Sequence, residues 1–269
     1  MKVMAILNAT PDSFYAASRT VPEDAAQRAL AMEKAGADLL DIGGESTRPG
    51  TAYVDASTEL SRILPVIKAI RTTGCTLPLS VDTRKRPVAE AAWKEGASWI
   101  NDVSALRDDP SMANFAAESG MTVVLMHAVG TSQTMQQAPY YTDVVQQVRD
   151  FLSQAVDRAL GAGIPAANII LDPGIGFGKT KTHNIELIQA LPQLKSLGFP
   201  LLVGLSRKSL LGDLLGVNTE DRLAGSLAGA LACLVQGTDW IRVHDVVETI
   251  QALTVFQALT KGAEAWTGY

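Results

Sequence analysis

The sequence predicts an α/β protein that folds as a closed (β/α)8 barrel, the TIM-barrel architecture, with a single domain over residues 1–269. Three observations support this prediction. Eight short β-rich runs alternate with segments in which apolar residues recur three or four positions apart. The runs are apolar without clear alternation, as in parallel strands buried on both faces. The length of 269 residues suits one barrel, for which about 250 is typical.

The expected strands are rich in Val, Ile, Leu and Trp and are bounded by Gly, Pro, Asn or Asp. They cover residues 2–7, 38–42, 77–81, 99–103, 122–126, 169–171, 200–204 and 240–243. Several intervening segments end in a glycine just before the next strand, at Gly36, Gly96, Gly120 and Gly237. Glycine readily adopts the left-handed conformation that ends a helix, so this spacing favours repeated βα units.

Helical periodicity is clearest from Ala25 to Glu33 and from Phe151 to Leu160. The segment Leu223–Val235 is more apolar than either. It is shorter than the roughly 20 residues that a membrane span needs, so it is predicted to be a buried helix.

Composition excludes several classes of function. The net charge is −5 and no Lys/Arg run occurs, which argues against a nucleic-acid partner. Cys75 and Cys233 lie far apart and form no C-x-x-C pair, which favours reduced thiols in the cytoplasm. The apolar run at the N-terminus is too short for a signal peptide. We therefore expect a soluble protein with no membrane partner.

Every expected strand is followed by at least one polar or ionisable side chain. A single Asp or Ser after a strand is commonly a helix N-cap, which could account for Asp82 or Asn101 alone. The carboxyl ends of barrel strands, however, meet at one mouth where active sites lie. One shared site therefore explains the whole set better, and its members are Asn8, Asp41 to Arg48, Asp82, Asn101, His127, Asp172, Ser206 to Ser209 and Arg242 to Asp245.

Some polar residues are interpreted differently. Residues 84–86 precede a helix and are expected at the solvated surface. His127 and His183 are equally compatible with structural hydrogen bonding and with function. The chain has three histidines and no H-E-x-x-H motif, which disfavours a zinc site.

The segment Leu171–Thr180, "LDPGIGFGKT", contains a Gly-Lys-Thr sequence that invites a phosphate-loop interpretation. The Walker pattern fails because Pro173 stands where its first glycine is required. The three glycines more plausibly let the backbone pass close to a flat ligand, with Phe177 offering an aromatic face.

The mouth residues fall into two chemical groups. Asp82, Asn101, Asp172 and Lys208 combine acceptors and donors suited to the edge of a polar heterocycle. The second group can bind phosphate, because arginine forks hold phosphate oxygens bidentately. Its members are Asn8, Thr47, Arg48, Arg242 and His244. An Asn oxygen beside phosphates favours Mg²⁺, and the segment 41–50 would act as an anion-binding lid. The arginines of this group and Mg²⁺ would stabilise the negative charge on a departing phosphate or pyrophosphate.

The chain resembles bacterial dihydropteroate synthase, of the pterin-binding barrel family, over nearly its whole length. The matching blocks are "ILNATPDSF", "DIGGESTRPG", "SVDT", "IND", "LMH", "LDPGIGFGKT", "LVGLSRKS" and "IRVHDV", in the order of the family. The resemblance implies condensation of 6-hydroxymethyl-7,8-dihydropterin pyrophosphate with p-aminobenzoate, giving 7,8-dihydropteroate and pyrophosphate in folate biosynthesis. It also implies a dissociative mechanism, sulfonamide inhibition and a homodimer.

The resemblance also implies roles for individual residues. The pterin would be held by Asp82, Asn101, Asp172 and Lys208. Pyrophosphate would be bound by Asn8, Thr47, Arg48, Arg242 and His244, with Asn8 also a ligand of Mg²⁺. p-Aminobenzoate would contact Phe14, Thr47, Pro49, Phe177 and Ser206. The residues implied in catalysis are Lys208, Asp82, Arg242 and His244.

The chain departs from the family in its first loop, which usually reads "NVTPDSFSDGG" and here reads "NATPDSFYAAS". Tyr15, Ala16, Ala17 and Ser18 replace an Asp that assists loop closure in the family and two glycines. We therefore expect altered sensitivity to sulfonamides.

Three alternatives remain open from the sequence. The first is a pterin-binding methyltransferase that passes a methyl group to a corrinoid, which would not need Arg48, Arg242 and His244 around a pyrophosphate. The second is a barrel lyase or aldolase that uses Lys208 as a Schiff base. The third is a non-catalytic folate-binding protein.

Overall fold

Eight parallel strands form one sheet in the order β6-β5-β4-β3-β2-β1-β8-β7. The computed structural model describes residues 1–9, 22–47, 50–130 and 133–261. A parallel bridge between Leu171 and Leu201 joins β6 to the chain that enters β7. The Leu171 N–H also donates to the Pro200 carbonyl at 2.9 Å. These contacts close the sheet, and the predicted barrel is confirmed.

The strands lie where the sequence predicted them. They are β1 (Lys2–Asn8), β2 (Leu39–Gly43), β3 (Leu79–Asp82), β4 (Trp99–Asp102), β5 (Thr122–Met126), β6 (Ile169–Asp172), β7 (Leu202–Val203) and β8 (Trp240–Val243). The prediction at 200–204 was wrong in extent. The Leu201 N–H donates to the Asp239 carboxylate at 2.7 Å instead of to a neighbouring strand, which shortens β7.

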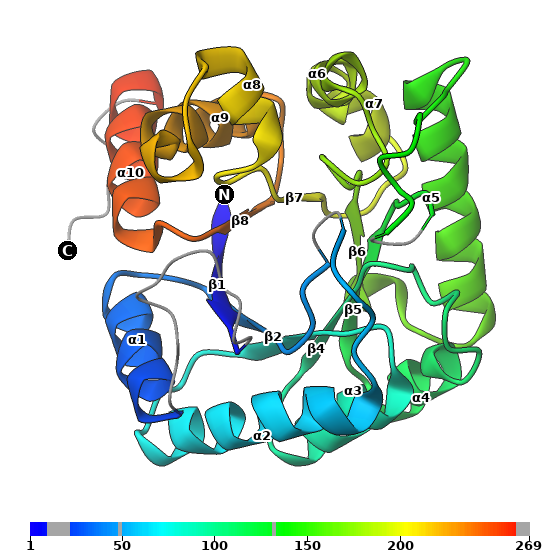
Figure 1. Cartoon of the computed structure of the whole chain (residues 1–269), viewed down its shortest axis with the longest axis vertical. Coiled ribbons are helices and arrows are strands. Elements are labelled where there is room, and N and C mark those ends of the chain that lie inside the picture. Colours follow the sequence, from blue (N-terminus) through cyan, green and yellow to red (C-terminus); the bar gives the residue numbers. More distant parts are fainter. Residues whose placement is uncertain (10–21, 48–49, 131–132, 262–269) are drawn as a thin grey trace.

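The helices form a ring outside the strands, as Figure 1 shows. They are α1 (Pro22–Lys34), α2 (Ala56–Thr72), α3 (Arg86–Lys94), α4 (Met112–Ser119), α5 (Val144–Gly161), α6 (Lys181–Gln189), α7 (Leu191–Lys195), α8 (Ser209–Leu215), α9 (Leu223–Val235) and α10 (Val246–Lys261). Gly36, Gly96, Gly120 and Gly237 all have positive φ angles, as their places before strands predicted.

The helix α9 matches its predicted bounds but is buried on one face only. Ser226, Ala230 and Cys233 are its buried residues, whereas Val235 is 68% exposed. Within the ranges that the structure describes, no helix combines the length and apolar character needed to cross a membrane.

The barrel interior has an apolar floor. Met4, Leu39, Val124, Ile170, Leu202 and Trp240 form one buried cluster there. The rings of Trp99 and Trp240 meet edge to face, with centroids 5.0 Å apart. Towards the carboxyl ends of β2, β3, β4 and β8 lie Asp41, Asp82, Asn101 and Arg242. The floor therefore separates the polar mouth from the opposite end of the barrel.

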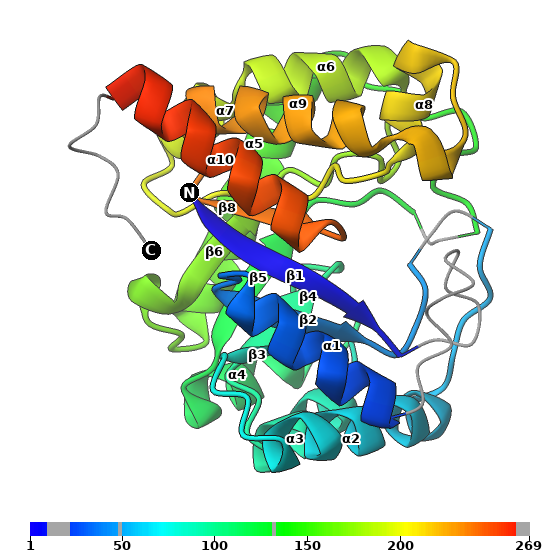
Figure 2. The ribbon, with the colours of Figure 1, turned by 90° about the vertical axis from the view of Figure 1, so that its left-hand side faces the viewer.

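All strands run in the same direction, so their carboxyl ends share one side of the molecule. Figure 2 shows β1 crossing the molecule from the N-terminus towards the side where the segment between β2 and α2 lies. That segment, residues 44–55, carries the "GESTRPG" part of the proposed lid. The fold thus places the described parts of this segment, residues 44–47 and 50–55, on the side of the molecule where the mouth lies.

Truncation of the floor should destabilise the barrel. Leu39 is fully buried between strands, so Leu39→Ala should lower the free energy of unfolding by about 2–5 kcal/mol through lost burial and a residual cavity. Denaturant titration followed by circular dichroism would measure this change. Leu160→Ala on α5 is the control, because Leu160 is 42% exposed and its loss should cost about 1 kcal/mol or less. Equal losses would contradict a packed floor.

Candidate active site

The mouth is organised around the Arg242 side chain, which reaches two carboxylates from other strands. Arg242 Nε donates to Asp41 Oδ2 at 2.6 Å, and its Nη2 donates to Asp82 Oδ2 at 2.8 Å. Asn101 Nδ2 also donates to Asp41 Oδ2, at 3.0 Å. Strand register explains the grouping, because Asp82 lies opposite Asn101 and Met4 lies opposite both Leu39 and Arg242. Four strands thus contribute to one hydrogen-bonded cluster.

Burial and ion pairing have opposite effects on the pKa values of the charged groups in this cluster. Burial disfavours the charge on Arg242, but Asp41 and Asp82 outweigh it and raise the pKa of the guanidinium. Burial also raises the pKa of Asp82 to about 7, although Arg242 acts in the opposite direction and Asp41 adds to the rise. Asp82 can therefore change its protonation state near neutral pH.

Asp41 was expected at the mouth from the sequence, but no chemical role was predicted for it. Its side chain is fully buried, and its Oδ2 accepts from both Arg242 and Asn101. Its Oδ1 is buried and has no hydrogen-bond partner among the described residues. A carboxylate inside the apolar run "DLLDIGG" is an unusual choice for a strand, and this was the available signal.

Asp172 and Lys208 approach the cluster from β6 and from the start of α8. Asp172 Oδ1 accepts from the Gly174 N–H at 2.7 Å, and Lys208 Nζ donates to the Ile175 carbonyl at 2.5 Å. Burial lowers the pKa of Lys208 to about 8, although Asp172 acts to raise it. Burial likewise raises the pKa of Asp172, against the effect of Lys208. Lys208 belongs to the same mouth as Arg242, because a Cβ on Gly204 would lie 3.8 Å from Lys208 Nζ and 3.9 Å from Arg242 Cδ.

The β6–α6 loop is built around Lys179, not around a phosphate. Lys179 is 3% exposed, and its ammonium donates to the carbonyls of Gly174 at 2.8 Å and Phe177 at 3.0 Å. It also lies 2.9 Å from His127 Nδ1. The sequence argument against a Walker loop is consistent with this geometry. Of the two histidines left open by the sequence, His183 makes a structural hydrogen bond that completes the capping box of α6 with Thr180, and His127 lies beside Lys179.

Glycine is required where this loop passes beneath the β5–α5 connection. Gly174 has a φ of +67°, and a Cβ there would lie 1.9 Å from the His127 carbonyl oxygen. The close passage brings the aromatic ring of Phe177 over Lys208, with 4.7 Å between Nζ and the ring centroid. The predicted aromatic face therefore lies beside the lysine of the mouth.

His244 and Ser206 form a second pair at the mouth. Ser206 Oγ lies 3.1 Å from His244 Nδ1 and accepts from the His244 N–H at 3.3 Å. The neighbouring Arg207 makes two charged hydrogen bonds to Asp245, at 2.8 and 2.7 Å. Ser206 was expected beside the aryl amine, but its hydroxyl is engaged with His244.

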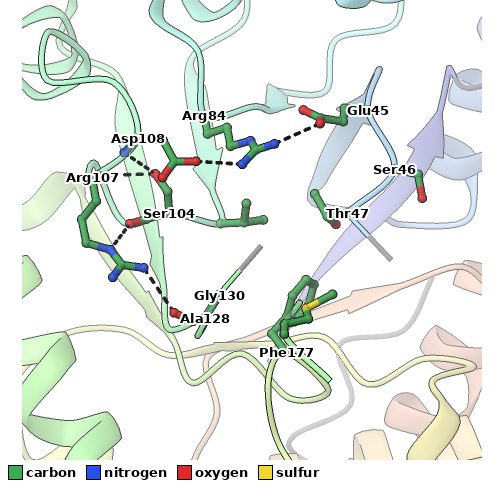
Figure 3. Close-up of a pocket in the computed structure, with 12 residues that line it drawn as sticks. Glu45, Ser46, Thr47, Arg84, Ser104, Arg107, Asp108, Ala128, Gly130 and Phe177 are labelled. Carbon is green, nitrogen blue, oxygen red and sulfur yellow. Dashed lines mark hydrogen bonds and ion pairs between the residues drawn. The ribbon is translucent and has the colours of Figure 1, made fainter. Parts of the chain in front are cut away.

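Thr47 and Phe177 face a hollow at the rim, which Figure 3 shows. Its empty volume, open to solvent, is about 470 Å³, and its lining includes Glu45, Thr47, Arg84, Arg107 and Phe177. The hollow lies between the segment after β2 and the β6–α6 loop. Phe14, Arg48 and Pro49 lie outside the described residues, as do the altered residues 15–18 of the first loop.

The expectation that residues 84–86 are solvated surface was wrong for Lys85. This side chain is 9% exposed and forms ion pairs with Glu45 at 2.5 Å and with Glu59 at 2.6 Å. Arg84 pairs with Glu45 at 3.1 Å and with Asp108 at 2.8 Å. The basic run looked like surface because its acidic partners come from distant segments.

Asn8 is the residue expected to bind Mg²⁺. A Cβ on Gly43 would lie 3.7 Å from Asn8 Oδ1 and 3.8 Å from Asp82 Oδ2, so both oxygens border the same glycine. In the described ranges, no three His, Cys, Asp or Glu side chains are grouped to hold a metal. Mg²⁺ commonly takes one or two protein oxygens and completes its shell with water and substrate phosphates. The residues present fit an ion of that kind.

Comparison with known proteins agrees with this geometry. Residues 4–244 match the family described as "Pterin binding enzyme". The dihydropteroate synthase of Escherichia coli strain K12 is 44% identical over 263 residues, which are 97% of this chain and 93% of that protein. The Mycobacterium leprae dihydropteroate synthase is also 44% identical, over 96% of this chain and 93% of that protein.

Solved structures give the same result. The Yersinia pestis dihydropteroate synthase in a sulfonamide drug complex superposes with a TM-score of 0.92 at 43% identity, over 97% of this chain and 94% of that one. The Xanthomonas albilineans dihydropteroate synthase with 4-aminobenzoic acid has a TM-score of 0.89 at 46% identity, over 96% and 92%. This chain belongs to the pterin-binding enzyme family and, within it, to the dihydropteroate synthases.

Proposed function

We propose a division of labour within the mouth for the reaction of a dihydropteroate synthase, which transfers a pterin-methyl group to p-aminobenzoate. The observation that carries the proposal is the convergence of Arg242 and Asn101 on Asp41, with Arg242 also on Asp82. The cluster offers carboxylate oxygens to a heterocycle and a guanidinium to phosphate in adjoining positions. Such a site suits a ring and a pyrophosphate joined through one methylene group.

The pterin is held by Asp82, Asn101, Asp172 and Lys208. The two carboxylates accept N–H bonds from the ring, and Lys208 donates to a ring carbonyl or nitrogen. Asp82, Asn101 and Asp172 are buried and Lys208 is half-buried, so their hydrogen bonds compete little with water. Asp41 joins this set as a proposed residue that orients Asn101 and Arg242. The ring thereby binds directly above the apolar floor.

Pyrophosphate is bound by Arg242 and His244, with Thr47 and Arg48 closing from the segment after β2. Arg242 donates one hydrogen bond to Asp41 and one to Asp82, and these two bonds fix the orientation of its remaining N–H groups. Asn8, together with substrate phosphate oxygens and water, would hold Mg²⁺. When bound, the ion supplies positive charge to the departing oxygens.

p-Aminobenzoate enters the rim hollow between Thr47 and Phe177, and Phe14 and Pro49 complete this pocket in the proposal. The ring of Phe177 offers an apolar face, and Arg84 and Arg107 add positive charge to the lining. Ser206 was included in this pocket from the resemblance. Its contact with His244 also suits a position at the border between the amine and the pyrophosphate. Sulfonamides would compete for the same space.

The reaction proceeds by substitution at the pterin methylene carbon. The C–O bond breaks with its electron pair leaving on pyrophosphate, and the positive charge that remains is shared with the pterin ring. The amine nitrogen of p-aminobenzoate then donates its lone pair to form the C–N bond and releases one proton to solvent. Arg242 and His244 stabilise the leaving oxygens, while Asp82 and Lys208 hold the ring in place. An aryl amine is neutral at neutral pH, so no strong general base is needed.

The rival use of Lys208 as a Schiff base is less compatible with this geometry. Its ammonium donates to the Ile175 carbonyl and lies over the Phe177 ring. Borohydride trapping of an adduct on Lys208 would support that alternative.

The direct assay of the proposed function mixes the protein with pterin pyrophosphate, p-aminobenzoate and Mg²⁺ and follows the formation of dihydropteroate. Formation of this product is expected, and its absence would favour the non-catalytic folate-binding alternative.

A homodimer, a single domain and a cytoplasmic location complete the proposal. Exposed apolar side chains on α9 and α10, including Val235, Val255 and Leu259, offer a surface that a second copy could cover. All described residues of the eight strands belong to one sheet, which supports one domain. The two cysteines, Cys75 and Cys233, are buried free thiols, as is usual in reducing compartments.

Arg242→Ala should weaken binding of both half-substrates. Loss of the guanidinium removes a pyrophosphate ligand, and it also removes the charge that opposes protonation of Asp82. We expect kcat/KM to fall on the order of 10²–10³-fold, with weaker binding of pyrophosphate and of pterin in calorimetry. His244→Ala is the matched comparison, since it should affect pyrophosphate alone. A normal pterin affinity in Arg242→Ala would contradict the shared role of Arg242.

Pterin binding should depend on pH through Asp82 and Lys208. Below a pH of about 7 Asp82 gains a proton and loses an acceptor, and above about 8 Lys208 loses its charge. Affinity for 6-hydroxymethylpterin, which lacks titrating phosphates, should therefore be greatest between these values. On the acid side it should fall by up to about tenfold per pH unit for one group. Asp82→Asn should bind weakly and lose the acid dependence. An unchanged acid limb in that variant would exclude Asp82 as its cause.

A further inference from the structure

The segment that carries Thr47 is fastened at its base by Glu45. One carboxylate oxygen, Glu45 Oε1, accepts from the Val54 N–H at 3.1 Å. This bond joins Glu45, before Thr47, to Val54 near the end of the segment, and we call these two bonded residues the stem of the loop that carries Thr47. The other oxygen, Oε2, accepts from Lys85 Nζ at 2.5 Å. Glu45 therefore fixes both ends of the loop to one point on the barrel.

Lys85 connects that point to the pterin half of the mouth. It follows Asp82 by three residues in the connection between β3 and α3. Its ammonium also donates to Glu59 Oε2 on α2 at 2.6 Å, and the Glu59 side chain is fully buried. The pair thus ties the loop stem to two elements that border the mouth, the end of β3 and the start of α2.

Neighbouring contacts hold the stem in the same position. Arg84 bridges Glu45 and Asp108, as Figure 3 shows. Arg62 Nη1 donates to the Gly44 carbonyl at 2.8 Å. A Cβ on Gly44 would lie 2.7 Å from the Ile63 side chain, so only glycine lets the chain pass this close to α2. The stem is therefore packed and hydrogen-bonded, while Thr47 projects towards the rim hollow.

The charges of this cluster favour a permanent ion pair between Glu45 and Lys85. Burial opposes the charge of Glu45, but the Lys85 ammonium, the Val54 N–H and Arg84 outweigh it and lower its pKa. Burial raises the pKa of Glu59, which shares the same lysine. Removal of either partner of the pair would leave a charge in a poorly solvated position.

We propose that Glu45 and Lys85 are positioning residues that set the loop carrying Thr47 at the correct height over the aryl-amine pocket. The inference rests on the proposed role of Thr47 in that pocket. Helices α2 and α3 also pack through apolar residues such as Ile63, Ile67 and Val88, so the barrel wall does not depend on the pair. Together with the Arg84–Glu45 ion pair, the pair links the loop that carries Thr47 to the connection that follows Asp82. The pair should therefore control capture of the amine and not of the pterin.

Kinetics of Glu45→Gln and Lys85→Met would test this proposal at pH 8, where Asp82 is ionised. Each change should raise the KM for p-aminobenzoate by about tenfold or more, because small misplacements of a positioning element are costly. The pterin dissociation constant should stay within about twofold. The double variant should lose little more than the worse single variant, as expected for residues that act as a unit. Lys94→Met, which breaks an exposed 2.9 Å bond to Glu90 on α3, is the control and should change neither constant.

Several outcomes would overturn the inference. A normal KM for p-aminobenzoate in Glu45→Gln would do so, as would equal weakening of amine and pterin with a lower unfolding temperature, which marks a purely structural pair. If Lys85→Met fails to fold, Glu45→Gln decides alone, because it keeps the side-chain size and the acceptor for Val54. Thr47→Ala distinguishes failure of the positioning role of Glu45 from failure of the proposed role of Thr47 in the pocket. A raised amine KM there with normal Glu45→Gln kinetics refutes the positioning role only, whereas a normal KM removes Thr47 from the pocket and the inference with it.

Discussion

The guanidinium of Arg242 between Asp41 and Asp82 is the interaction on which the mouth of this barrel depends. Its two ion pairs join residues 201 and 160 positions apart in the chain. A buried carboxylate destabilises the fold unless a cation or hydrogen-bond donor is paired with it. Removal of one partner therefore leaves the remaining charges buried without compensation. The cluster is therefore stable only as a set. In the proposed site the ring and the phosphate groups adjoin because the same arginine borders both.

The fold was predictable because its signals are local and repeated. Each strand is an apolar run, and each return to the sheet is marked by a glycine such as Gly36 or Gly237. Much of the site was predictable for the same reason, since barrel geometry carries strand ends to one mouth. β7 was overestimated because a side chain of Asp239 took the place of a strand partner, which no local pattern reveals.

The residues that sequence reasoning missed have partners that only the fold brings near. Lys85 stands in a run of charged residues that looks solvated, yet its partners lie 40 and 26 positions away. Asp41 was noted at a strand end but given no role, because its value depends on Arg242 across the barrel. Lys179 illustrates the opposite case. It sits in a phosphate-loop-like sequence, but the carbonyls of its own loop occupy its protons.

The apolar floor formed by Leu39, Trp240 and their neighbours lies beneath the polar residues of the mouth, so ligands of the proposed site would approach from the rim. Whatever occupies the deepest position must arrive before anything that sits above it. In the proposed site the pterin lies next to this floor, so it would enter before p-aminobenzoate, and pyrophosphate would leave on the side from which the amine arrives. Binding in the proposed site would therefore be ordered, and the rate of product release can limit turnover as much as bond formation does.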